Sequence, residues 1–331
     1  MKAVICTQYG PPDVLQIKEV EKPVPKENEV MVKVSAFTVS AADYRVRSFT
    51  VPPSYWLPAR LALGILRPRK PVLGMDFAGE VEAVGRAVNK YRIGDPVFGL
   101  LGERFGAYAQ YLCISEDWKS AGLAGKPDGL SHEQAAAIPF GGLTALYFLR
   151  AANIQKGQKV LINGASGSVG TYAVQLAKYF GADVTAVCST EKLALVESLG
   201  ADKLIDYSKG DFTKSGDTYD VVLEAAGTAS VSGCLDSLTG EGTLLHAVAT
   251  PAVTLHMKWA ALTSKRKMVG GGPDANTEDL RFLGELVAAG KMKAVIDRIF
   301  PMEQIVEAHR YVETGAKKGN IVISLAANGD A

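Results

Sequence analysis

Residues Lys159 to Ser189 read KVLINGASGSVGTYAVQLAKYFGADVTAVCS, and this stretch is the most informative about the architecture of the chain. An apolar run at 160–162 enters the glycine-rich turn 163–170, which opens a helical pattern that continues through Lys178. A stop at Gly181 and a second apolar run at 184–188 follow within about 30 residues of the first run. Strand, glycine turn, helix and strand in this order predict a βαβ unit of a parallel sheet.

The three-residue spacing of Gly164, Gly167 and Gly170 favours a dinucleotide site over an ordinary glycine-rich connection. In such a turn the glycines let the backbone approach a pyrophosphate, which rests on the N–H groups and the positive end of the helix. We expect contacts to the cofactor from the whole loop, namely Gly164, Ala165, Ser166, Gly167, Ser168, Val169 and Gly170.

The end of the second strand predicts which cofactor is bound. A carboxylate about 20 residues after the glycines normally binds the ribose hydroxyls of NAD, but the residue 19 positions after Gly170 is Ser189. A hydroxyl there, with Thr190 beside it, does not repel a 2′-phosphate, and Lys192 can donate a charge-assisted hydrogen bond to it. The pattern therefore predicts NADPH rather than NADH.

Length and composition set the frame for this unit. A chain of 331 residues permits two domains of about 150 residues each. The net charge of +1 argues against nucleic acid or a membrane surface as the main partner. No run approaches about 18 apolar residues, so no membrane span is expected. Residues 1–5 resemble a strand rather than the apolar region of a signal peptide, which predicts a cytoplasmic location.

The cysteines and histidines are scattered. Cys6, Cys113, Cys188 and Cys234 form no close pair, which predicts buried thiols in a reducing compartment rather than disulfides or a zinc site. The four histidines, at positions 132, 246, 256 and 309, are expected to be helix-cap or surface residues.

The chain divides into three parts. Residues 1–124 hold short β-branched runs separated by Gly and Pro (30–35, 77–84, 96–99 and 107–114), which predict an antiparallel, barrel-like domain. Residues 125–295 alternate helices and strands, the mark of a doubly wound parallel sheet. Its expected helices are 131–137, 143–152, 192–199, 231–238 and 278–289, and its later strands are 203–206, 220–224 and 242–246. The tail shows a strand at 296–300, a helix at 303–313 and a strand at 320–325.

Several segments together resemble the quinone oxidoreductase branch of the medium-chain dehydrogenase/reductase superfamily. The segments are 41–47 (AADYRVR), 71–81 (PVLGMDFAGEV), 94–99 (GDPVFG), 141–145 (GGLTA) and the glycine turn, and they span nearly the whole chain. The resemblance implies an α/β architecture in which a GroES-like β-barrel catalytic domain, 1–124 completed by 296–331, carries an inserted Rossmann domain, 125–295, that binds NADP(H).

The resemblance also identifies what is missing. Zinc alcohol dehydrogenases of this superfamily carry a cysteine and a Gly-His-Glu segment, where this chain has Ser40 or its neighbours and Gly74-Met75-Asp76. A thioether is a poor substitute for an imidazole on Zn²⁺, so we predict no metal. Reduction of a simple ketone then lacks a Lewis acid. Quinones and α,β-unsaturated carbonyls spread the incoming charge themselves, which makes them the expected acceptors.

By the same resemblance, further residues receive roles. Ser40 and Tyr44 are the expected hydroxyl donors to the acceptor oxygen, and Phe49, Trp56, Met75 and Phe140 the expected pocket walls. The remaining cofactor contacts are expected from Thr144, Tyr207, Ala225, Gly227, His246, Ala247, Val248, Lys318, Gly319 and Asn320. Where Asn320 stands, the family often has lysine.

Two points stay open at this level. Segment 48–70 is longer and more apolar than a connection needs, and we hypothesise that it is a lid over the active site that selects the acceptor. Alternative functions are an NADP-dependent alcohol dehydrogenase or carbonyl reductase, and an NADPH-binding regulatory protein with little catalysis. A homodimer is expected, because the superfamily commonly pairs Rossmann sheet edges.

Overall fold

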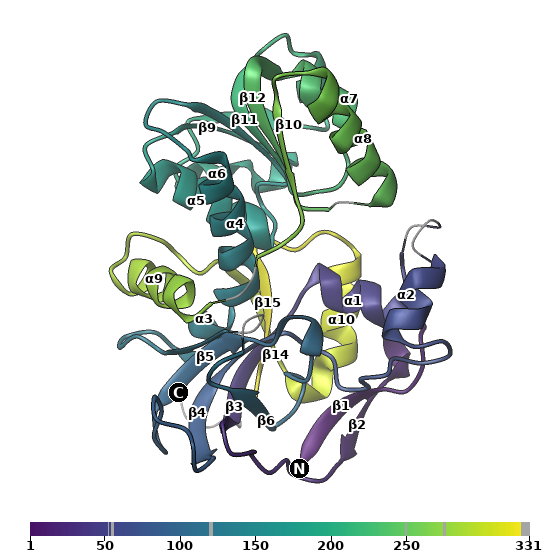
Figure 1. Cartoon of the computed structure of the whole chain (residues 1–331), viewed down its shortest axis with the longest axis vertical. Helices are drawn as coiled ribbons and strands as arrows, with labels where there is room; N and C mark the ends of the chain where they lie inside the picture. The colour runs from purple at the N-terminus through teal and green to yellow at the C-terminus, as the bar shows by residue number, and fades with distance from the viewer. Residues whose placement is uncertain (52, 54–55, 119–121, 249, 274–275, 326–331) are drawn as a thin grey trace. The chain divides into compact units, whose positions relative to one another are not determined.

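The chain forms two compact units, which are described separately (Figure 1). The computed structural model describes all residues except 52, 54–55, 119–121, 249, 274–275 and 326–331. Unit 1 comprises Met1–Phe140, Asp274–Gly290 and Ala294–Ala331, and unit 2 comprises Gly141–Pro273 and Lys291–Lys293. No helix within the described ranges has the length and apolar character needed to cross a bilayer.

Unit 2 is a six-stranded sheet in the order β10-β9-β8-β11-β12-β13, and every pairing is parallel. Its strands are β8 (Lys159–Asn163), β9 (Asp183–Cys188), β10 (Lys203–Asp206), β11 (Tyr219–Glu224), β12 (Leu238–His246) and β13 (Lys267–Gly270). This is the 3-2-1-4-5-6 order of dinucleotide-binding sheets. The predicted doubly wound sheet is confirmed.

The helices of unit 2 cover both faces of the sheet, with α5 and α6 on one side and α7 and α8 on the other (Figure 1). They are α4 (Pro139–Ala152, whose first two residues belong to unit 1), α5 (Ser168–Tyr179), α6 (Leu193–Ser198), α7 (Val231–Asp236) and α8 (Pro251–Thr263), with short 3-10 turns at Thr190–Lys192 and Phe212–Lys214. Helix α8 and strand β13 were not predicted from the sequence. The predicted start of α4 was also four residues late, because Pro139 is tolerated in the first turn of a helix.

Unit 1 contains a seven-stranded sheet built from both ends of the chain. The order is β14-β15-β3-β4-β5-β7, with β6 also paired to β3. Its strands are β3 (Glu29–Val39), β4 (Asp76–Val84), β5 (Pro96–Leu100), β6 (Tyr111–Ser115), β7 (Gly122–Gly125), β14 (Ile296–Pro301) and β15 (Asn320–Ser324), and a separate antiparallel pair is β1 (Lys2–Cys6) with β2 (Leu15–Glu19). Strand β15 runs antiparallel to β3, so residues 321–324 lie beside residues 36–39.

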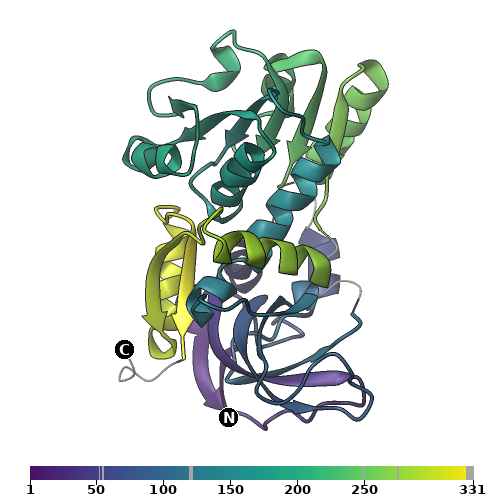
Figure 2. The same cartoon turned by 90° about the vertical axis from the view of Figure 1, so that its left-hand side faces the viewer.

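Unit 1 also contains the helices α1 (Ala41–Ser48), α2 (Trp56–Leu63), α3 (His132–Ala136), α9 (Thr277–Ala288) and α10 (Ile305–Glu313), with 3-10 turns at Pro12–Val14, Gly102–Arg104 and Met302–Gln304. Of these helices, α3, α9 and α10 pack on strands of this sheet. Helix α10 packs against β14 and β15 (Figure 2). Helix α9 packs on β7, where a Cβ on Gly122 would lie 2.6 Å from Leu280 Cδ1. Residues 125–140 and α9 thus cluster with unit 1, outside the range 1–124 and 296–331.

The predicted strand 107–114 is wrong in its first half. Strand β6 begins at Tyr111, and before it Ala109 forms an isolated bridge with Ala3 of β1. Tyr108 is fully buried, and its carbonyl accepts from the N–H of Val4 in β1. Tyr108 then belongs to the apolar core of unit 1, stacked on Phe37 with 4.8 Å between ring centroids.

Candidate functional site

Two of the three loop glycines are required by the chain itself. Gly164 has a φ of +81°, a conformation that side chains rarely adopt, and its N–H and that of Ala165 donate to the carbonyl of Val187 (3.2 and 3.1 Å). A Cβ on Gly170 would lie 2.1 Å from the carbonyl oxygen of Gly164. The first turn of α5 therefore packs directly on the turn that leaves β8.

Gly167 has a different role. Its φ of −82° suits any residue, and a Cβ there would lie 3.5 Å from Gly164 oxygen, an ordinary contact. It is the N-cap of the 12-residue helix α5 but provides no capping side chain. The backbone N–H groups at the helix start suit a phosphate. Of the residues there, Ser166 and Ser168 are buried and Val169 is half-buried. The loop thus fits the pyrophosphate of a dinucleotide.

A buried carboxylate organises the carboxyl edge of the sheet. Glu224, at the end of β11, is fully buried, and its oxygens accept from the N–H groups of Ala226 (2.8 Å), Gly227 (2.6 Å) and Ala229 (3.2 Å). It also accepts from Nδ2 of Asn163, the last residue of β8, at 2.6 Å. Sequence reasoning missed both residues. A charged residue that ends an apolar strand in such a fold is the signal that could have found them.

The loops after β11 and β12 meet where the sequence predicted cofactor contacts. Gly227 has a φ of +74°, and a Cβ there would lie 3.2 Å from Val248 Cβ. Ala225 and Ala247 are half-buried beside them. His246 is buried at the end of β12, which lowers its pKa, and its Nδ1 has no hydrogen-bond partner among the described residues. The expectation of a surface histidine is wrong there, since β12 is an inner strand.

The adenosine end of the predicted site lies at the carboxyl ends of β9 and β10. Ser189 is half-buried, Thr190 and Tyr207 are exposed, and Lys192 is half-buried in the short turn after β9. A carboxylate that sequence reasoning did not consider lies among them. Asp206 accepts from the hydroxyls of Thr190 and Ser208, and these bonds lower its pKa to about 2.

Thr144 lies on the face of α4 that contacts the start of α5. A Cβ on Gly141 would lie 2.5 Å from the carbonyl oxygen of Ser168. Residues three apart share a helix face, so Thr144, which is buried, follows Gly141 along this contact. The structure therefore brings Thr144 to the same side of unit 2 as the glycine loop.

In unit 1, Ser40 and Asp43 form the capping box of α1. The Ser40 hydroxyl donates to Asp43 Oδ2 at 2.6 Å, and the Asp43 N–H donates back to Ser40 Oγ at 3.3 Å. Both residues are buried. The hydroxyl proton predicted for an acceptor oxygen is thus already shared with a carboxylate. The spacing of a serine and an acidic residue three positions later is a helix-start signal that the sequence analysis did not use.

Asp43 belongs to a pair of buried carboxyl groups. Burial raises the pKa of Asp43 to about 6, against the hydrogen bonds from Ser40. Burial raises the pKa of Asp76 to about 8. The hydroxyl of Thr38 donates to Asp76 Oδ2 at 2.5 Å and lowers this pKa, whereas the charge of Asp43 raises it further. Asp76 Oδ1 accepts from the N–H of Phe140 at 2.9 Å. Asp43 Oδ1 has no hydrogen-bond partner within the described part, although Gly74 and Tyr108 lie close enough to lower its pKa.

A chain of buried polar side chains continues from this pair. Tyr108 Oη lies 3.2 Å from His309 Nε2, and the Nε of Arg47 donates to His309 Nδ1 at 3.3 Å. Arg47 is fully buried, bonds the carbonyl of Gly10 and forms an ion pair with Glu313. Burial lowers the pKa of His309 to about 3, so the ring is neutral. His309 is therefore no surface residue, contrary to expectation.

The predicted pocket walls fall into two groups. Phe49 and Trp56 meet edge to face with ring centroids 6.2 Å apart, and Trp56 is 51% exposed. Met75 is buried next to Asp76 in the sequence. The backbone N–H of Phe140 donates to the carboxyl group of Asp76. Tyr44, the other predicted donor, is half-buried and packs against the core of unit 1.

The hypothesised lid, segment 48–70, contains helix α2. Residues 52 and 54–55 of this segment lie outside the described residues. The role of the segment in selecting the acceptor stays a prediction.

The residues predicted to contact the cofactor from the C-terminal tail make hydrogen bonds and packing contacts within unit 1. Asn320 is buried, and its Nδ2 donates to the carbonyl of Val295 at 3.1 Å. Gly319 has a φ of +68°, and a Cβ there would lie 2.4 Å from the same carbonyl oxygen. The N–H of Lys318 donates to Asp297 at 3.0 Å.

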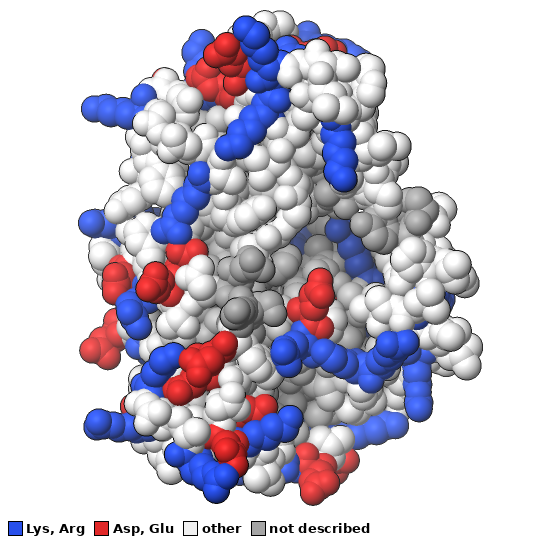
Figure 3. Space-filling model, viewed as in Figure 1, with Lys and Arg blue, Asp and Glu red and all other residues white. Residues whose placement is uncertain are grey.

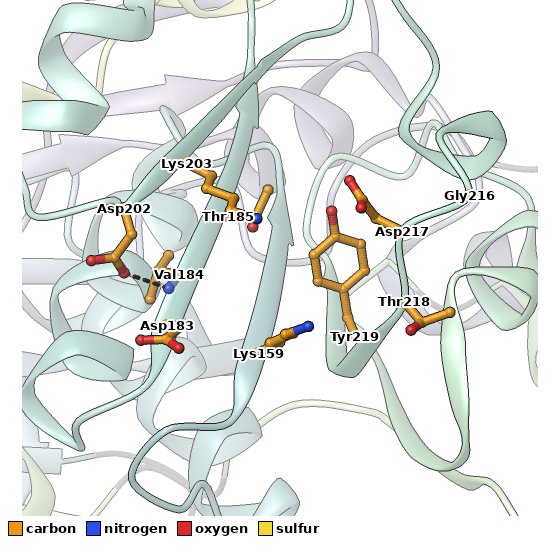
Figure 4. A pocket seen from close by; sticks show the side chains of 10 residues that line it. All are labelled: Lys159, Asp183, Val184, Thr185, Asp202, Lys203, Gly216, Asp217, Thr218 and Tyr219. Carbon is orange, nitrogen blue, oxygen red and sulfur yellow. Dashed lines mark hydrogen bonds between the residues drawn. The ribbon is translucent and has the colours of Figure 1, made fainter.

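Among the described residues, no metal-ligand cluster coincides with the predicted site, and a cavity of unit 2 lies at the opposite edge of the sheet. Over the described ranges, no three His, Cys, Asp or Glu residues lie close enough to share a metal ion. A cavity of about 380 Å³ lies where β8 to β11 begin, lined by Lys159, Lys203, Asp217 and Tyr219 among others (Figure 4). Ligands of open parallel sheets bind at the opposite, carboxyl edge, where Asn163 and Glu224 lie.

Comparison with known proteins agrees with this geometry. Residues 26–127 match the alcohol dehydrogenase GroES-like domain, and residues 199–323 match the zinc-binding dehydrogenase family. The chain is 34% identical to the 2-methylene-furan-3-one reductase of Solanum lycopersicum, over 98% of this chain and 79% of that protein. It is 32% identical to the NADPH-dependent alkenal/one oxidoreductase of Arabidopsis thaliana, again over 98% and 79%.

A solved structure extends the agreement to the whole fold. The quinone oxidoreductase of Coxiella burnetii superposes with a TM-score of 0.89 at 33% identity, over 98% of this chain and 99% of that one. The fold of both units is therefore shared over nearly the whole chain. The chain belongs to the quinone oxidoreductase branch of the medium-chain dehydrogenase/reductase superfamily.

Proposed function

We propose that this protein is an NADPH-dependent oxidoreductase that reduces quinones or α,β-unsaturated carbonyl compounds. The observation that carries the proposal is Gly167, a glycine that the chain does not need for its own packing but that leaves the start of α5 open to a phosphate. The relatives support the acceptor class, because their names refer to a methylene-furanone, alkenals or enones, and quinones.

The residues of unit 2 that would hold NADPH are the glycine loop for the pyrophosphate and Ser189 with Lys192 for the 2′-phosphate. Asp206 lies among these residues as an ionised carboxylate, and the ammonium group of Lys209, 3.7 Å from it, offsets part of its charge. Glu224 holds the loop 225–229 in place. When bound, NADPH supplies the hydride.

For the acceptor oxygen we propose Tyr44 and Ser40 as hydrogen-bond donors. A tyrosine hydroxyl donates without being a strong acid at neutral pH, and water can deliver the final proton. The Ser40 hydroxyl becomes available when Asp43 is protonated, since a protonated carboxyl group can donate to Ser40 Oγ instead of accepting from it. Because burial raises the pKa of Asp43 to about 6, this exchange sets in as the pH falls toward that value.

We also propose that the reaction needs no metal. Where zinc alcohol dehydrogenases have their zinc ligands, this chain has the hydroxyl of Ser40 and the thioether of Met75. The Ser40 hydroxyl is hydrogen-bonded to Asp43. Neither side chain is a good Zn²⁺ ligand. Metal analysis of the active protein tests this, and zinc in stoichiometric amount with alcohol oxidation would overturn it.

The decisive test of the cofactor assignment is a matched pair of lysine variants. Lys192→Ala should weaken NADPH binding by about tenfold or more and NADH binding far less, because it removes a charge-assisted bond to the phosphate. Lys203→Ala, at the opposite edge of the sheet, removes the same charge and should change neither. Equal losses for both cofactors in Lys192→Ala would contradict the assignment.

An acceptor panel tests the reaction itself. NADPH oxidation should proceed with quinones, enones or alkenals and not with simple ketones. Turnover of alcohols with NADP⁺ would favour a dehydrogenase instead, and tight NADPH binding without turnover on any acceptor would favour a regulatory protein.

We further propose a homodimer and a cytoplasmic location. Strand β13 is an edge of the parallel sheet, and α8 next to it exposes Leu255, Trp259 and Leu262, with exposed fractions of 71%, 61% and 87%. Such a patch beside a free strand edge suits a second copy of the chain. The four cysteines are all unpaired, as suits a reducing compartment. Light scattering on the purified protein measures the oligomeric state.

A further inference from the structure

The net charge of the chain conceals one strongly basic stretch. Between Tyr44 and Met75 there are six basic residues and no Asp or Glu, whereas the whole chain has 36 basic and 35 acidic residues. Arg47 is buried, and Arg67, Arg69 and Lys70 lie exposed just after α2. This part of unit 1 is therefore locally cationic, although the protein is nearly neutral.

The same stretch exposes large apolar side chains. Trp56, Leu57 and Leu61 of α2 are 51%, 61% and 56% exposed, and Ile65 and Leu66 after it are 64% and 84% exposed. No residue of α2 is buried. In Figure 3 the surface around α2, on the right-hand side, is mainly uncharged and is bordered by Lys and Arg. We call these five side chains with Arg67, Arg69 and Lys70 the α2 surface.

Specific contacts fix the inner side of α2, so its apolar face is held outward. The Arg60 guanidinium lies 3.8 Å from the centroid of the Phe49 ring and 4.5 Å from that of Tyr9. Tyr9 Oη donates to the carbonyl of Gly64 at 2.9 Å, and Arg60 Nη1 donates to the carbonyl of Ile65 at 2.6 Å. A side chain at Gly64 would collide with the carbonyl of Arg67 at 2.1 Å. The helix and the turn after it are thus built to present these side chains.

We propose that the α2 surface docks the protein on an anionic lipid bilayer. Leu and Trp side chains that enter the boundary between headgroups and acyl chains, flanked by basic residues that contact anionic headgroups, are the mark of a helix lying on a membrane. The charge selects this partner over a second copy of the chain, because a symmetric pair would set two cationic surfaces against each other. Helix α2 also carries no Ser, Thr, Asn or Gln, whereas protein interfaces contain regular hydrogen bonds.

The test is flotation of the full-length protein with two kinds of vesicle, phosphatidylcholine alone and phosphatidylcholine with about one third phosphatidylglycerol. The wild type should float with the anionic vesicles and much less with the neutral ones. Leu57→Glu/Leu61→Glu should reduce the partition coefficient by more than about tenfold. Val24→Glu/Ile93→Glu adds the same charge at two positions outside the α2 surface, 82% and 69% exposed, and should retain most of the binding.

A charge-removal variant separates lipid docking from self-association of the protein. Arg67→Gln/Arg69→Gln/Lys70→Gln should reduce binding to anionic vesicles by about a hundredfold and remove its dependence on salt. NADPH binding, which we assign to unit 2, should be unchanged in every variant, and a thermal unfolding curve like that of the wild type shows that unit 1, which carries the substitutions, is folded. The proposal is overturned if the wild type ignores anionic vesicles, if Leu57→Glu/Leu61→Glu binds them as the wild type does, or if that variant instead breaks a dimer.

Discussion

Two of the loop glycines offer a sharp test, because the structure assigns them different tasks. In Gly170→Ala the new Cβ would lie 2.1 Å from Gly164 oxygen and 2.6 Å from Ala165 Cα. Overpacking of this kind costs about 1 to 3 kcal/mol, and here both partners are backbone atoms that cannot rotate away. Alanine recovers up to about 1 kcal/mol of helix propensity. We expect a net loss of about 2 kcal/mol in the free energy of unfolding, together with weaker NADPH binding.

Gly167→Ala is the matched control for folding. Its Cβ would meet only an ordinary contact of 3.5 Å, and its φ of −82° suits alanine, so the free energy of unfolding should fall by about 1 kcal/mol or less. The methyl group nevertheless occupies the space through which the backbone approaches the pyrophosphate. NADPH affinity should fall more than about tenfold.

The measurements are denaturant unfolding followed by circular dichroism and titration of NADPH by fluorescence. Gly170→Ala should lose both stability and NADPH binding, whereas Gly167→Ala should lose binding alone. The different tasks assigned to the two glycines are wrong if Gly167→Ala binds NADPH within about twofold of the wild type, or if Gly170→Ala unfolds at the wild-type denaturant concentration.

Three other variants test the buried polar groups. Folding raises the pKa of Asp76 from 3.8 to about 8, so between these values the folded state keeps a proton that the unfolded chain has lost. The free energy of unfolding should therefore fall as the pH rises through this range. Asp76→Asn should flatten that slope, measured by urea unfolding at about pH 5 and pH 8. Arg47→Met leaves Glu313 and its other partners unpaired and should cost about 3 kcal/mol, measured by thermal unfolding. Glu224→Gln replaces one hydrogen-bond acceptor by a donor and should lower NADPH affinity and the free energy of unfolding by on the order of 2 kcal/mol. Glu241→Gln, at an exposed position of β12, should change neither. Equal behaviour of the two variants would contradict the role of Glu224 in holding the loop 225–229.

The parts of the fold that could be predicted are those that local sequence determines. The glycine turn, its flanking strands and the helix between them are consecutive, so their periodicity alone indicates a βαβ unit. Strands β7 and β13 are only four residues long, and β7 reads Gly-Leu-Ala-Gly, which has no strand propensity to detect. They exist because neighbouring strands and helices cover them.

The polar chemistry of unit 1 could not be predicted in the same way. The bond between Arg47 and His309 joins residues 262 positions apart, so no spacing in the sequence announces it. Ser40 was selected by resemblance for its hydroxyl, but the carboxylate that takes its proton became evident only when α1 was seen to begin there. The roles of Ser40, Tyr44 and the pocket residues stay predictions.

The pairing of β15 with β3 affects how the chain is made. Strand β3 leaves the ribosome before the strands of unit 2, but β15, its neighbour across residues 36–39, is synthesised after them. All six strands of unit 2 are complete before β15 emerges, and domains tend to fold as units in the order of synthesis. Until then an apolar edge of β3 stays open to other chains. Products truncated before residue 320 should therefore aggregate through unit 1, while the parallel sheet encoded between the two halves of unit 1 is already formed.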